Sequence, residues 1–461
     1  MNKLIPSYYA EYGRSIDLYR AIPINIDGLK LVERRILWAL SKINKKTKSV
    51  NAIGEAIKIH PHGDLALYGV MDQQVFQHRA IGYGSWGSLE KEGMTSPAAA
   101  RYTSIQINNK MCKTSFEYIN DVPYENFDFT LEPLYLADAI PLGLCGRNNI
   151  IGIGFHSTVI PRYNKADLAK RLYWLLTDNN KNIKFDQDGD LLDFGPCIKP
   201  AYNDCESMEE TKYAYHEILM NGIGTLKLVP KGGIDENNII HVQGKSSTHS
   251  FKPLLTYCSN NKIEVIENNQ EDDPYFIDLE LKVPKKIWVD HSIKKTFKFI
   301  WTKFLIKSVT YRCNFVDLEN KIVNIHGIDQ VLLNNYNYYT YTIFNHKCKE
   351  FERLNIEYFH NSIILIIKDI FNKHIIKTVD DILKHYNSKD VITLEKLDTT
   401  YIKYQRLITR EDIDYVVGNN SIKKLINVQI DINKTTQKIN KCKLDIQNIE
   451  SDCFKLVRSY F

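Results

Sequence analysis

The stretch Ser96-Pro97-Ala98-Ala99-Ala100-Arg101-Tyr102-Thr103 places a phenol beside a fixed cation after a run of small side chains. A Ser followed by Pro predicts the start of a helix, because Ser can cap free N–H groups and Pro fits the first turn. The alanines would continue this turn and present Tyr102 at an edge. The ordinary alternative is a packing tyrosine in a chain that has 28 tyrosines.

Arg101 and Tyr102 together suggest chemistry on a phosphate. A phenol has a pKa of about 10, so it needs a base, a cation or a metal before it can attack phosphorus at neutral pH. Arg101 stays protonated, and its planar fork matches the geometry of a phosphate. A phosphotyrosine ester formed in this way would keep the bond energy of the broken strand. The pair therefore predicts a reversible strand breaker.

The segment from Ala98 to Thr103 resembles the active-site tyrosine motif of the DNA-cleaving subunit of type IIA topoisomerases. This is the family of gyrase A and topoisomerase IV C subunits. Three further blocks are similar to the same family and follow its order along the chain. These blocks are Arg20-Ala21-Ile22-Pro23 with Asp27-Gly28-Leu29-Lys30 and Arg34-Arg35; His60-Pro61-His62-Gly63-Asp64; and Ile140-Pro141 with Gly146 to Gly154.

The resemblance implies a role for each matching position. Tyr102 is the nucleophile, and Arg101 stabilises charge on the phosphate under attack. Other basic residues contact DNA phosphates or act as general acid/base helpers. This last set is Arg20, Lys30, Arg34, Arg35, His60 and His62.

Two of these assignments have structural alternatives. The His60-Pro61-His62 sequence is a weak metal signal without a nearby carboxylate or Cys cluster, and structural turn histidines are the plain interpretation. Ile151 is, by resemblance, the wedge that unstacks base pairs and bends DNA. Its alternative is a buried strand isoleucine, since the similarity slips by one residue before Ile160-Pro161.

The chain departs from the family just after the histidines. Quinolone-sensitive bacterial enzymes carry a serine and, four residues on, an acidic residue that anchor the drug through a metal–water bridge. This chain has Leu65 and Gly69 at those positions. We expect fluoroquinolones to trap its cleavage complex poorly.

The composition sets the broad class of protein. The 461 residues carry a formal charge of +5, but residues 1 to 113 alone hold 16 Lys or Arg against 9 Asp or Glu. This local surplus of positive charge is consistent with a nucleic-acid-binding surface and equally with an ordinary solvated basic face. The nine cysteines form no C-x-x-C pair, and no run approaches 18 apolar residues. We expect a cytoplasmic protein with free thiols, or one in the host cytoplasm or nucleoid if the source is a phage.

The resemblance implies an N-terminal arm and a winged-helix DNA-cleavage domain over residues 1–136, and apolar periodicity predicts its helices. A helix is expected over Gly28 to Ile43, and two shorter helices over Ala52 to Ile57 and Asp64 to about Gln77 flank the His60 turn. Helix, tight turn, helix beside basic residues is typical of a winged-helix domain. Gly82 to Ser88 is predicted to be a flexible loop.

Residues 137–325 are predicted to form a mixed α/β tower domain, as in the family. The pattern indicates a helix over Lys165 to Leu176 and a loop over Ile234 to Asn238. Asp186 to Asp190 imitates a calcium loop, but Cys197 stands where Glu is needed, which favours a solvated turn. Strands are expected near Gly224 to Val229, Ile239 to Val242 and Tyr275 to Val283.

Residues 326–461 are predicted to form a coiled coil and a dimer gate. Helices are expected over Gly327 to Leu354, Ile356 to Lys373 and Ser421 to about Ile449, with a globular tip over 374–420 that ends near Gly418-Asn419-Asn420. The last helix carries a heptad seam typical of a coiled coil. The seam consists of Leu425, Ile432, Ile439 and Ile446, with Val428, Thr435, Cys442 and Ile449 three positions on.

These features predict an α+β, multidomain protein: a winged-helix domain, a tower, and a long antiparallel coiled coil with a helical gate. The resemblance implies an ATP-dependent type II DNA topoisomerase subunit that acts on double-stranded DNA as a homodimer. ATP and Mg²⁺ would be bound by the ATPase and TOPRIM modules of a gyrase B-like partner, in a heterotetramer or larger assembly, because this sequence shows neither module.

The layout looks like the cleavage subunit of T-even-type bacteriophage topoisomerases. Since Phe461 ends the sequence without a DNA-wrapping domain, we expect relaxation and decatenation without supercoiling. The alternative function is a non-catalytic, dimeric winged-helix DNA-binding or architectural protein.

Overall fold

The computed structural model describes residues 4–460 except 88–95, 128–129, 178–194, 201–207, 246–250, 268–275, 320, 375–377, 387–390, 398–400 and 419–428. Asp186 to Asp190, Asn419-Asn420, Leu425 and Val428 therefore lie outside the described residues. The chain divides into two compact units, residues 1–339 with 454–461 and residues 340–453. The predicted domain boundaries at residues 136 and 325 are not tested by this division and stay predictions. No described helix is long and apolar enough to cross a membrane.

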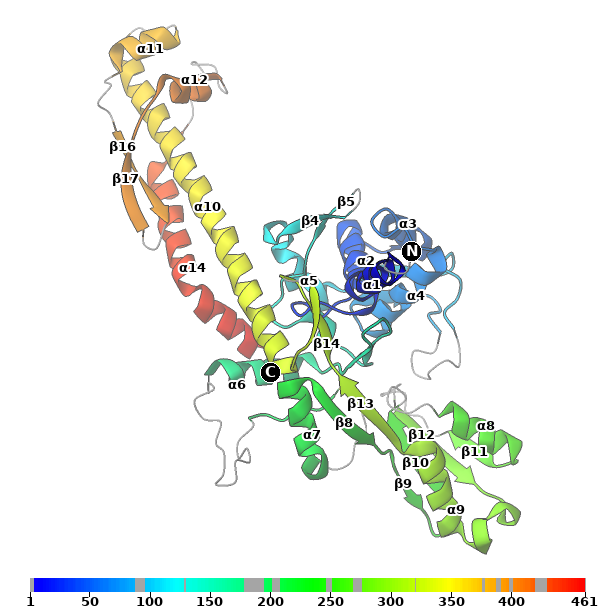
Figure 1. The fold of residues 1–461 in the computed structure, drawn as a ribbon. Coiled ribbons are helices and arrows are strands. Elements are labelled where there is room, and N and C mark those ends of the chain that lie inside the picture. Colours follow the sequence, from blue (N-terminus) through cyan, green and yellow to red (C-terminus); the bar gives the residue numbers. More distant parts are fainter. Residues whose placement is uncertain are drawn as a thin grey trace. The chain divides into compact units, whose positions relative to one another are not determined.

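The first unit begins with five helical segments (Figure 1). Three of them match the predicted helices closely, including the two on either side of the His60 turn. The segments are α1 (Leu4–Ile16), the π-helix η1 (Asp17–Ala21), α2 (Leu31–Ile43), α3 (Ser49–Ile57) and α4 (Asp64–Phe76). At the start of α2, the Lys30 N–H donates to Glu33 Oε2 at 3.0 Å, and Asn44 ends the helix in the left-handed region at φ 44°.

A small antiparallel sheet packs with α2, α3 and α4. Its strand order is β1 (Thr47–Lys48), β3 (Ser104–Ile107), β2 (Ala80–Tyr83). The predicted loop over Gly82 to Ser88 is therefore wrong in its first two residues, since Gly82 and Tyr83 pair with β3. The shared core includes Leu29, Ile36, Leu37, Leu67, Met71, Ile105 and Ile107.

The predicted helix start at Ser96-Pro97 is also wrong. Residues 96–99 are irregular, and only a turn follows, closed by the Tyr102 N–H donating to the Ala99 carbonyl at 2.8 Å. The reason lies in tertiary contacts. The Ala98 N–H donates to the Ser85 carbonyl at 3.0 Å, so this backbone is held against the segment after β2 instead of winding into a helix.

Short elements continue the first unit. They are α5 (Asn109–Glu117), η2 (Ile119–Asp121), β4 (Tyr124–Phe127), β5 (Thr130–Pro133), η3 (Leu142–Leu144), β6 (Ile150–Gly152), β7 (Thr158–Ile160) and α6 (Lys165–Thr177). Strands β6 and β7 belong to an antiparallel sheet of order β6-β7-β13-β8, whose other members come from later in the chain.

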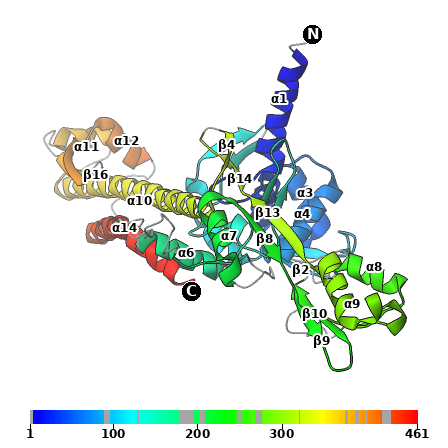
Figure 2. The ribbon, with the colours of Figure 1, turned by 60° about the horizontal axis from the view of Figure 1, so that its bottom comes forward.

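The predicted tower segment contains two four-stranded sheets (Figures 1 and 2). Strands β8 (Ile223–Leu228) and β13 (Lys307–Arg312) complete the first sheet after α7 (Met208–Asn221). The second sheet has the order β11-β12-β10-β9, and its apolar side chains pack against α8 (Lys252–Asn260) and α9 (Ile293–Ile300). Its strands are β9 (Lys231–Ile234), β10 (Ile240–Lys245), β11 (Glu264–Glu267) and β12 (Phe276–Lys282).

The predicted strands at β8, β10 and β12 are confirmed. The loop predicted from Ile234 begins one residue later, because Lys231 to Ile234 pairs with β10 as β9. Two glycines in β9 lower its strand propensity, and only the partner strand reveals it. Short helices η4 (Lys285–Ile287), η5 (Val289–His291) and η6 (Trp301–Leu305) and the hairpin β14 (Asn314–Asp317), β15 (Ile322–Ile325) complete the segment.

The second unit is built on α10 (Ile328–Lys373), which enters it at Thr340. The two helices predicted over Gly327 to Leu354 and Ile356 to Lys373 are thus one continuous helix. The remaining elements are α11 (Val379–His385), the hairpin β16 (Val391–Leu397) and β17 (Tyr401–Leu407), α12 (Arg410–Gly418) and α14 (Ile432–Arg458).

Helix α14 packs antiparallel to α10 within this unit. Ile439 and Cys442 of the predicted seam are buried against Phe351 and Leu354. Lys347 pairs with Asp445 at 3.1 Å. The two helices are antiparallel because residues later in α14 contact residues earlier in α10.

Candidate active site

Tyr102 lies at an exposed turn at the edge of the small sheet. Its side chain is 65% exposed, as the edge prediction required, and no hydrogen bond engages its hydroxyl among the described residues. The Arg101 guanidinium carbon is 4.7 Å from the centre of the Tyr102 ring. The pair is therefore presented to solvent together, which leaves both the phenol oxygen and the cation available to a ligand.

Buried hydroxyl groups, which the sequence did not indicate, contact the residues on either side of the turn. Tyr68 on α4 donates to the Ala98 carbonyl at 2.6 Å and lies 2.9 Å from Thr103 Oγ1. Thr103 Oγ1 in turn donates to Ser49 Oγ at 2.8 Å. The exposed Tyr102 side chain thus lies next to a buried network of hydroxyl groups.

His60 and His62 stack at the start of α4, with ring centres 4.0 Å apart. Arg35 lies 2.8 Å from His60 Nδ1 and forms an ion pair with buried Glu132 at 2.6 Å. Burial, followed by the nearby His62 and Arg35, lowers the pKa of His60 to about 4. His60 is therefore neutral near pH 7. Because its Nδ1 faces an arginine donor, its Nε2 carries the proton; the His60 side chain is only 7% exposed.

Arg34 is not available to DNA. Its side chain is buried and forms a bidentate pair with buried Asp27, at 2.7 Å to Oδ2 and 3.0 Å to Oδ1. Asp27 also accepts from the Leu29 and Leu136 N–H groups. The predicted DNA contact by Arg34 is thus replaced by a structural role, which periodicity alone does not reveal because the partner carboxylate precedes the helix.

Arg20 and Lys30 line a cleft of about 520 Å³ between α2, α4 and the β6-β7-β13-β8 sheet. Lys307 of β13 and buried Arg162 also line it, whereas Glu33 is the only acidic residue in this described lining. Burial and the Arg162 charge lower the pKa of Lys30, against the opposing effect of Glu33. The surplus of positive charge makes the cleft suited to anions. Neither Arg162 nor Lys307 was predicted: Lys307 lies far along the chain from the motifs, and Arg162 follows them without belonging to one.

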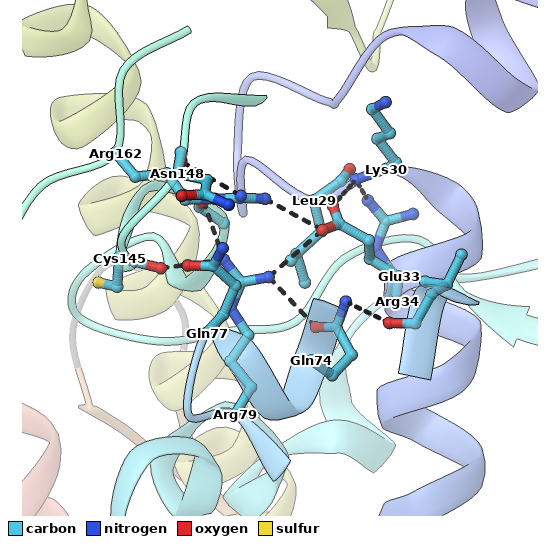
Figure 3. Close-up of polar contacts among 12 residues, drawn as sticks. Leu29, Lys30, Glu33, Arg34, Gln74, Gln77, Arg79, Cys145, Asn148 and Arg162 are labelled. Carbon is cyan, nitrogen blue, oxygen red and sulfur yellow. Dashed lines mark hydrogen bonds and ion pairs between the residues drawn. The ribbon is translucent and has the colours of Figure 1, made fainter. Parts of the chain in front are cut away.

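Glu33 on α2 pairs with two arginines from other segments, Arg79 and Arg162 (Figure 3). It accepts from Arg162 at 3.1 Å and from fully buried Arg79 at 3.4 Å. Burial alone would raise the pKa of Glu33, but Arg162 and Arg79 outweigh it and lower that pKa. The two arginines also donate to backbone carbonyls of residues 143, 145 and 148. Helix α2 is thereby fastened to the segment that leads into β6.

Ile151 is 60% exposed in β6 at the rim of the same cleft. This exposure contradicts the buried-strand alternative. The neighbouring Ile153 is 82% exposed. On the inner side of this segment, Gly152 and Gly154 approach η1 so closely that an added Cβ would lie 2.2 Å from the Ala21 carbonyl oxygen and 2.1 Å from Asp17 Oδ1. The glycines therefore let the strand press against η1 while the isoleucines face outward.

No group of three or more His, Cys, Asp or Glu side chains suited to a metal occurs in the described part of the chain. His60 and His62 stack on each other, and the polar groups that contact the Tyr102 turn are hydroxyls and backbone amides. This donor set does not fit a magnesium ion, which prefers carboxylate and water oxygens.

Two helices joined by a tight turn, an exposed Arg–Tyr pair, a neutral histidine and a basic cleft are together typical of proteins that bind nucleic-acid phosphates. The family model for the A subunit of DNA gyrase/topoisomerase IV matches residues 20–458, and the chain belongs to this family.

Relatives at moderate identity agree with this assignment. The A subunit of DNA topoisomerase 4 from Haemophilus influenzae is 36% identical over 68% of this chain and 43% of its own length. The A subunit of DNA gyrase from Lawsonia intracellularis is 33% identical over 37% of this chain and 22% of its own length. The corresponding gyrase chain of Buchnera aphidicola is 34% identical over 38% and 22%, respectively. The chain thus matches less than half the length of these relatives.

Proposed function

We propose that this chain is the DNA-breakage-reunion subunit of an ATP-dependent type II DNA topoisomerase. The observation that carries the proposal is the exposed Arg101–Tyr102 pair on a helix–turn–helix body, in a chain of the gyrase A/topoisomerase IV family. The three helices and the β1-β3-β2 sheet fit a winged-helix domain, in which α4 would enter the major groove.

In the proposed reaction, the Tyr102 phenol oxygen attacks the phosphorus of a DNA phosphodiester. A tyrosine O–P bond forms, the P–O3′ bond breaks, and the phenol proton is balanced by a proton gained at the leaving 3′ oxygen. Religation is the reverse. Arg101 would bind the non-bridging oxygens through its fork, where negative charge develops. His60 would donate from Nε2 to a phosphate, since its Nδ1 faces Arg35 and it is neutral.

The cleft and the exposed isoleucine support a role in DNA bending. Ile151 would insert between base pairs, at a cost of a few kcal/mol that wrapped contacts offset. Arg20 and Lys30 would then meet the phosphates that flank the bend. Arg34 is left out of the contact set because Asp27 binds it.

Partners and cofactors are part of the proposal. The described residues near Tyr102 do not fit Mg²⁺, and we place the ion in the TOPRIM domain of a gyrase B-like partner, where it would stabilise charge on the reacting oxygens. The same partner would bind ATP. A homodimer closed through residues 340–453, with two partner chains, would form a heterotetramer. The layout of the T-even-type phage enzymes stays a prediction.

The competing function is a DNA-binding or architectural protein with an inert Tyr102. Trapping distinguishes the two. The protein is incubated with DNA, Mg²⁺ and a gyrase B-like partner, denatured, and examined for protein attached to 5′ DNA ends. We expect an adduct from the unaltered chain and none from Tyr102→Phe, which keeps the ring and should still bind DNA. An adduct in Tyr102→Phe would exclude Tyr102 as nucleophile, and DNA binding by the unaltered chain without any adduct would favour the architectural function.

A further inference from the structure

Three buried hydroxyl groups form a chain beneath the Arg101–Tyr102 turn. The Tyr68 hydroxyl reaches the Ala98 carbonyl at 2.6 Å and Thr103 Oγ1 at 2.9 Å, and Thr103 Oγ1 donates to Ser49 Oγ at 2.8 Å. Thr103 and Ser49 are fully buried, and Tyr68 is 8% exposed. The chain therefore joins α3, α4 and the start of β3 at one point.

Backbone contacts close the same frame. The Ser49 N–H donates to the Thr103 carbonyl at 3.1 Å. The first residue of α3 is thus bonded to the residue that follows Tyr102. Gly84, at φ +92°, lies beneath the turn, and a Cβ there would be 3.2 Å from the Tyr102 carbonyl oxygen. The exposed pair thus lies between Ala98 and Thr103, whose carbonyl oxygen and Oγ1 are both within hydrogen-bond distance of the Tyr68 hydroxyl, which has one proton to donate.

The Tyr68 ring and its hydroxyl have separable effects. The ring packs in the core beside Trp86, with ring centres 5.4 Å apart. The hydroxyl contributes only its hydrogen bonds, each of which adds little to stability once the exchange with water is counted. A small loss of stability can still matter for chemistry, because a displacement of about 1 Å in a reacting group can lower a rate by about a hundredfold.

We propose that Tyr68 is a positioning residue for Tyr102, acting through the Ala98 carbonyl and the Thr103 hydroxyl. The inference rests on the proposed function for its rate consequence, but not for its structural consequence. Tyr68 sets where the phenol oxygen of Tyr102 lies relative to the bound phosphate, while DNA binding depends on the basic cleft.

The test uses the full chain with its gyrase B-like partner, Mg²⁺ and a DNA duplex. Tyr68→Phe removes the hydroxyl and keeps the ring. We expect the rate of covalent-complex formation to fall about tenfold, with the DNA dissociation constant changed by less than about twofold, because only the reacting geometry is loosened. Thr103→Val should act likewise, and Thr103→Ser should restore the rate by returning the hydroxyl.

The matched control is Tyr83→Phe. Tyr83 lies in β2 of the same sheet, and its hydroxyl donates to Gln106 Oε1 at 3.2 Å instead of to Ala98 or Thr103. It should leave the cleavage rate unchanged. Because Tyr68 and Thr103 belong to one hydrogen-bond chain, Tyr68→Phe/Thr103→Val should lose less than the product of the two single effects. Unchanged cleavage in Tyr68→Phe, or an equal loss in Tyr83→Phe, would overturn the proposal.

Hydrogen exchange gives a readout that does not need catalysis. The Ala98 and Tyr102 N–H groups are both hydrogen-bonded in the turn. Their exchange should quicken in Tyr68→Phe and stay unchanged in Tyr83→Phe. Failure of the unaltered chain to form any adduct would refute the proposed function alone, whereas unchanged exchange of the turn in Tyr68→Phe would refute the positioning role alone.

Discussion

The Lys30 ammonium donates to the Ile151 carbonyl at 2.6 Å. This bond joins the residue that precedes α2 to the exposed isoleucine of β6. The Lys30 N–H also donates to Glu33, which pairs with Arg162. The strand that carries Ile151 is therefore bonded to the start of α2. A wedge needs such rigidity, because base pairs are unstacked only if the inserted side chain does not yield.

We expect Ile151→Ala to weaken DNA bending and lower strand cleavage without unfolding the protein. The side chain is 60% exposed, so its removal should change the free energy of unfolding by less than about 0.5 kcal/mol. Bending is measured by energy transfer between the ends of a labelled duplex. Leu131→Ala, at an equally exposed leucine of β5, is the control. Normal bending in Ile151→Ala, with loss in Ile153→Ala, would move the wedge to Ile153.

Arg101→Lys should lower the cleavage rate by about tenfold or more, because a point charge does not replace a planar fork at a developing phosphate charge. The dissociation constant for DNA should change little, since the basic cleft is untouched. Single-turnover cleavage and equilibrium binding on the same duplex check this. Cleavage at the unaltered rate would remove Arg101 from the reaction.

Asp72 on α4 gives a pH-dependent stability prediction. Burial raises its pKa from 3.8 to about 6, and its Oδ1 has no hydrogen-bond partner among the described residues. The folded state therefore holds the proton more tightly than the unfolded state. The favourable contribution of protonated Asp72 is fully present below pH 3.8 and is lost as pH rises to about 6.

Asp72→Asn removes this penalty. At pH 8 it should raise the free energy of unfolding by about 1 kcal/mol, a value reduced for partial solvent screening, and the gain should shrink as pH falls from about 6 toward about 4. Denaturant unfolding at several pH values measures it. Glu117→Gln, at an exposed carboxylate of α5, should show no such trend. A gain independent of pH would contradict the role of the Asp72 charge.

Drug sensitivity should follow two exposed positions of α4. Leu65 is 81% exposed, and the space around Gly69 is open for a side chain. Neither offers the side-chain oxygen that the quinolone metal–water bridge needs. Leu65→Ser/Gly69→Asp should lower the fluoroquinolone concentration for half-maximal trapping by about thirtyfold, since two restored hydrogen bonds contribute about 1 kcal/mol each. Leu65→Ala/Gly69→Ala should not, and equal sensitisation by both pairs would exclude the bridge.

Elements with short-range signals could be predicted from the order of residues alone. Apolar periodicity located α2 and α4, and the His60-Pro61-His62-Gly63 turn between α3 and α4 needed no distant partner. The sequence also identified Tyr102 as an edge residue beside Arg101, because small neighbours leave such a side chain uncovered. The motif order was sufficient to indicate the family that the comparisons then showed.

Which polar groups face solvent and which are paired depends on contacts between distant parts of the chain. Arg34 was predicted to contact DNA, but it pairs with Asp27. No helix starts at Ser96-Pro97, because this segment is hydrogen-bonded to Ser85 and Tyr68. Arg162 and Lys307 reach the cleft from far along the chain. The physical reason is common to all of these. A helix period reports burial of apolar area, which repeats locally, whereas a buried charge or hydroxyl is settled by one partner that the fold brings from a distant residue.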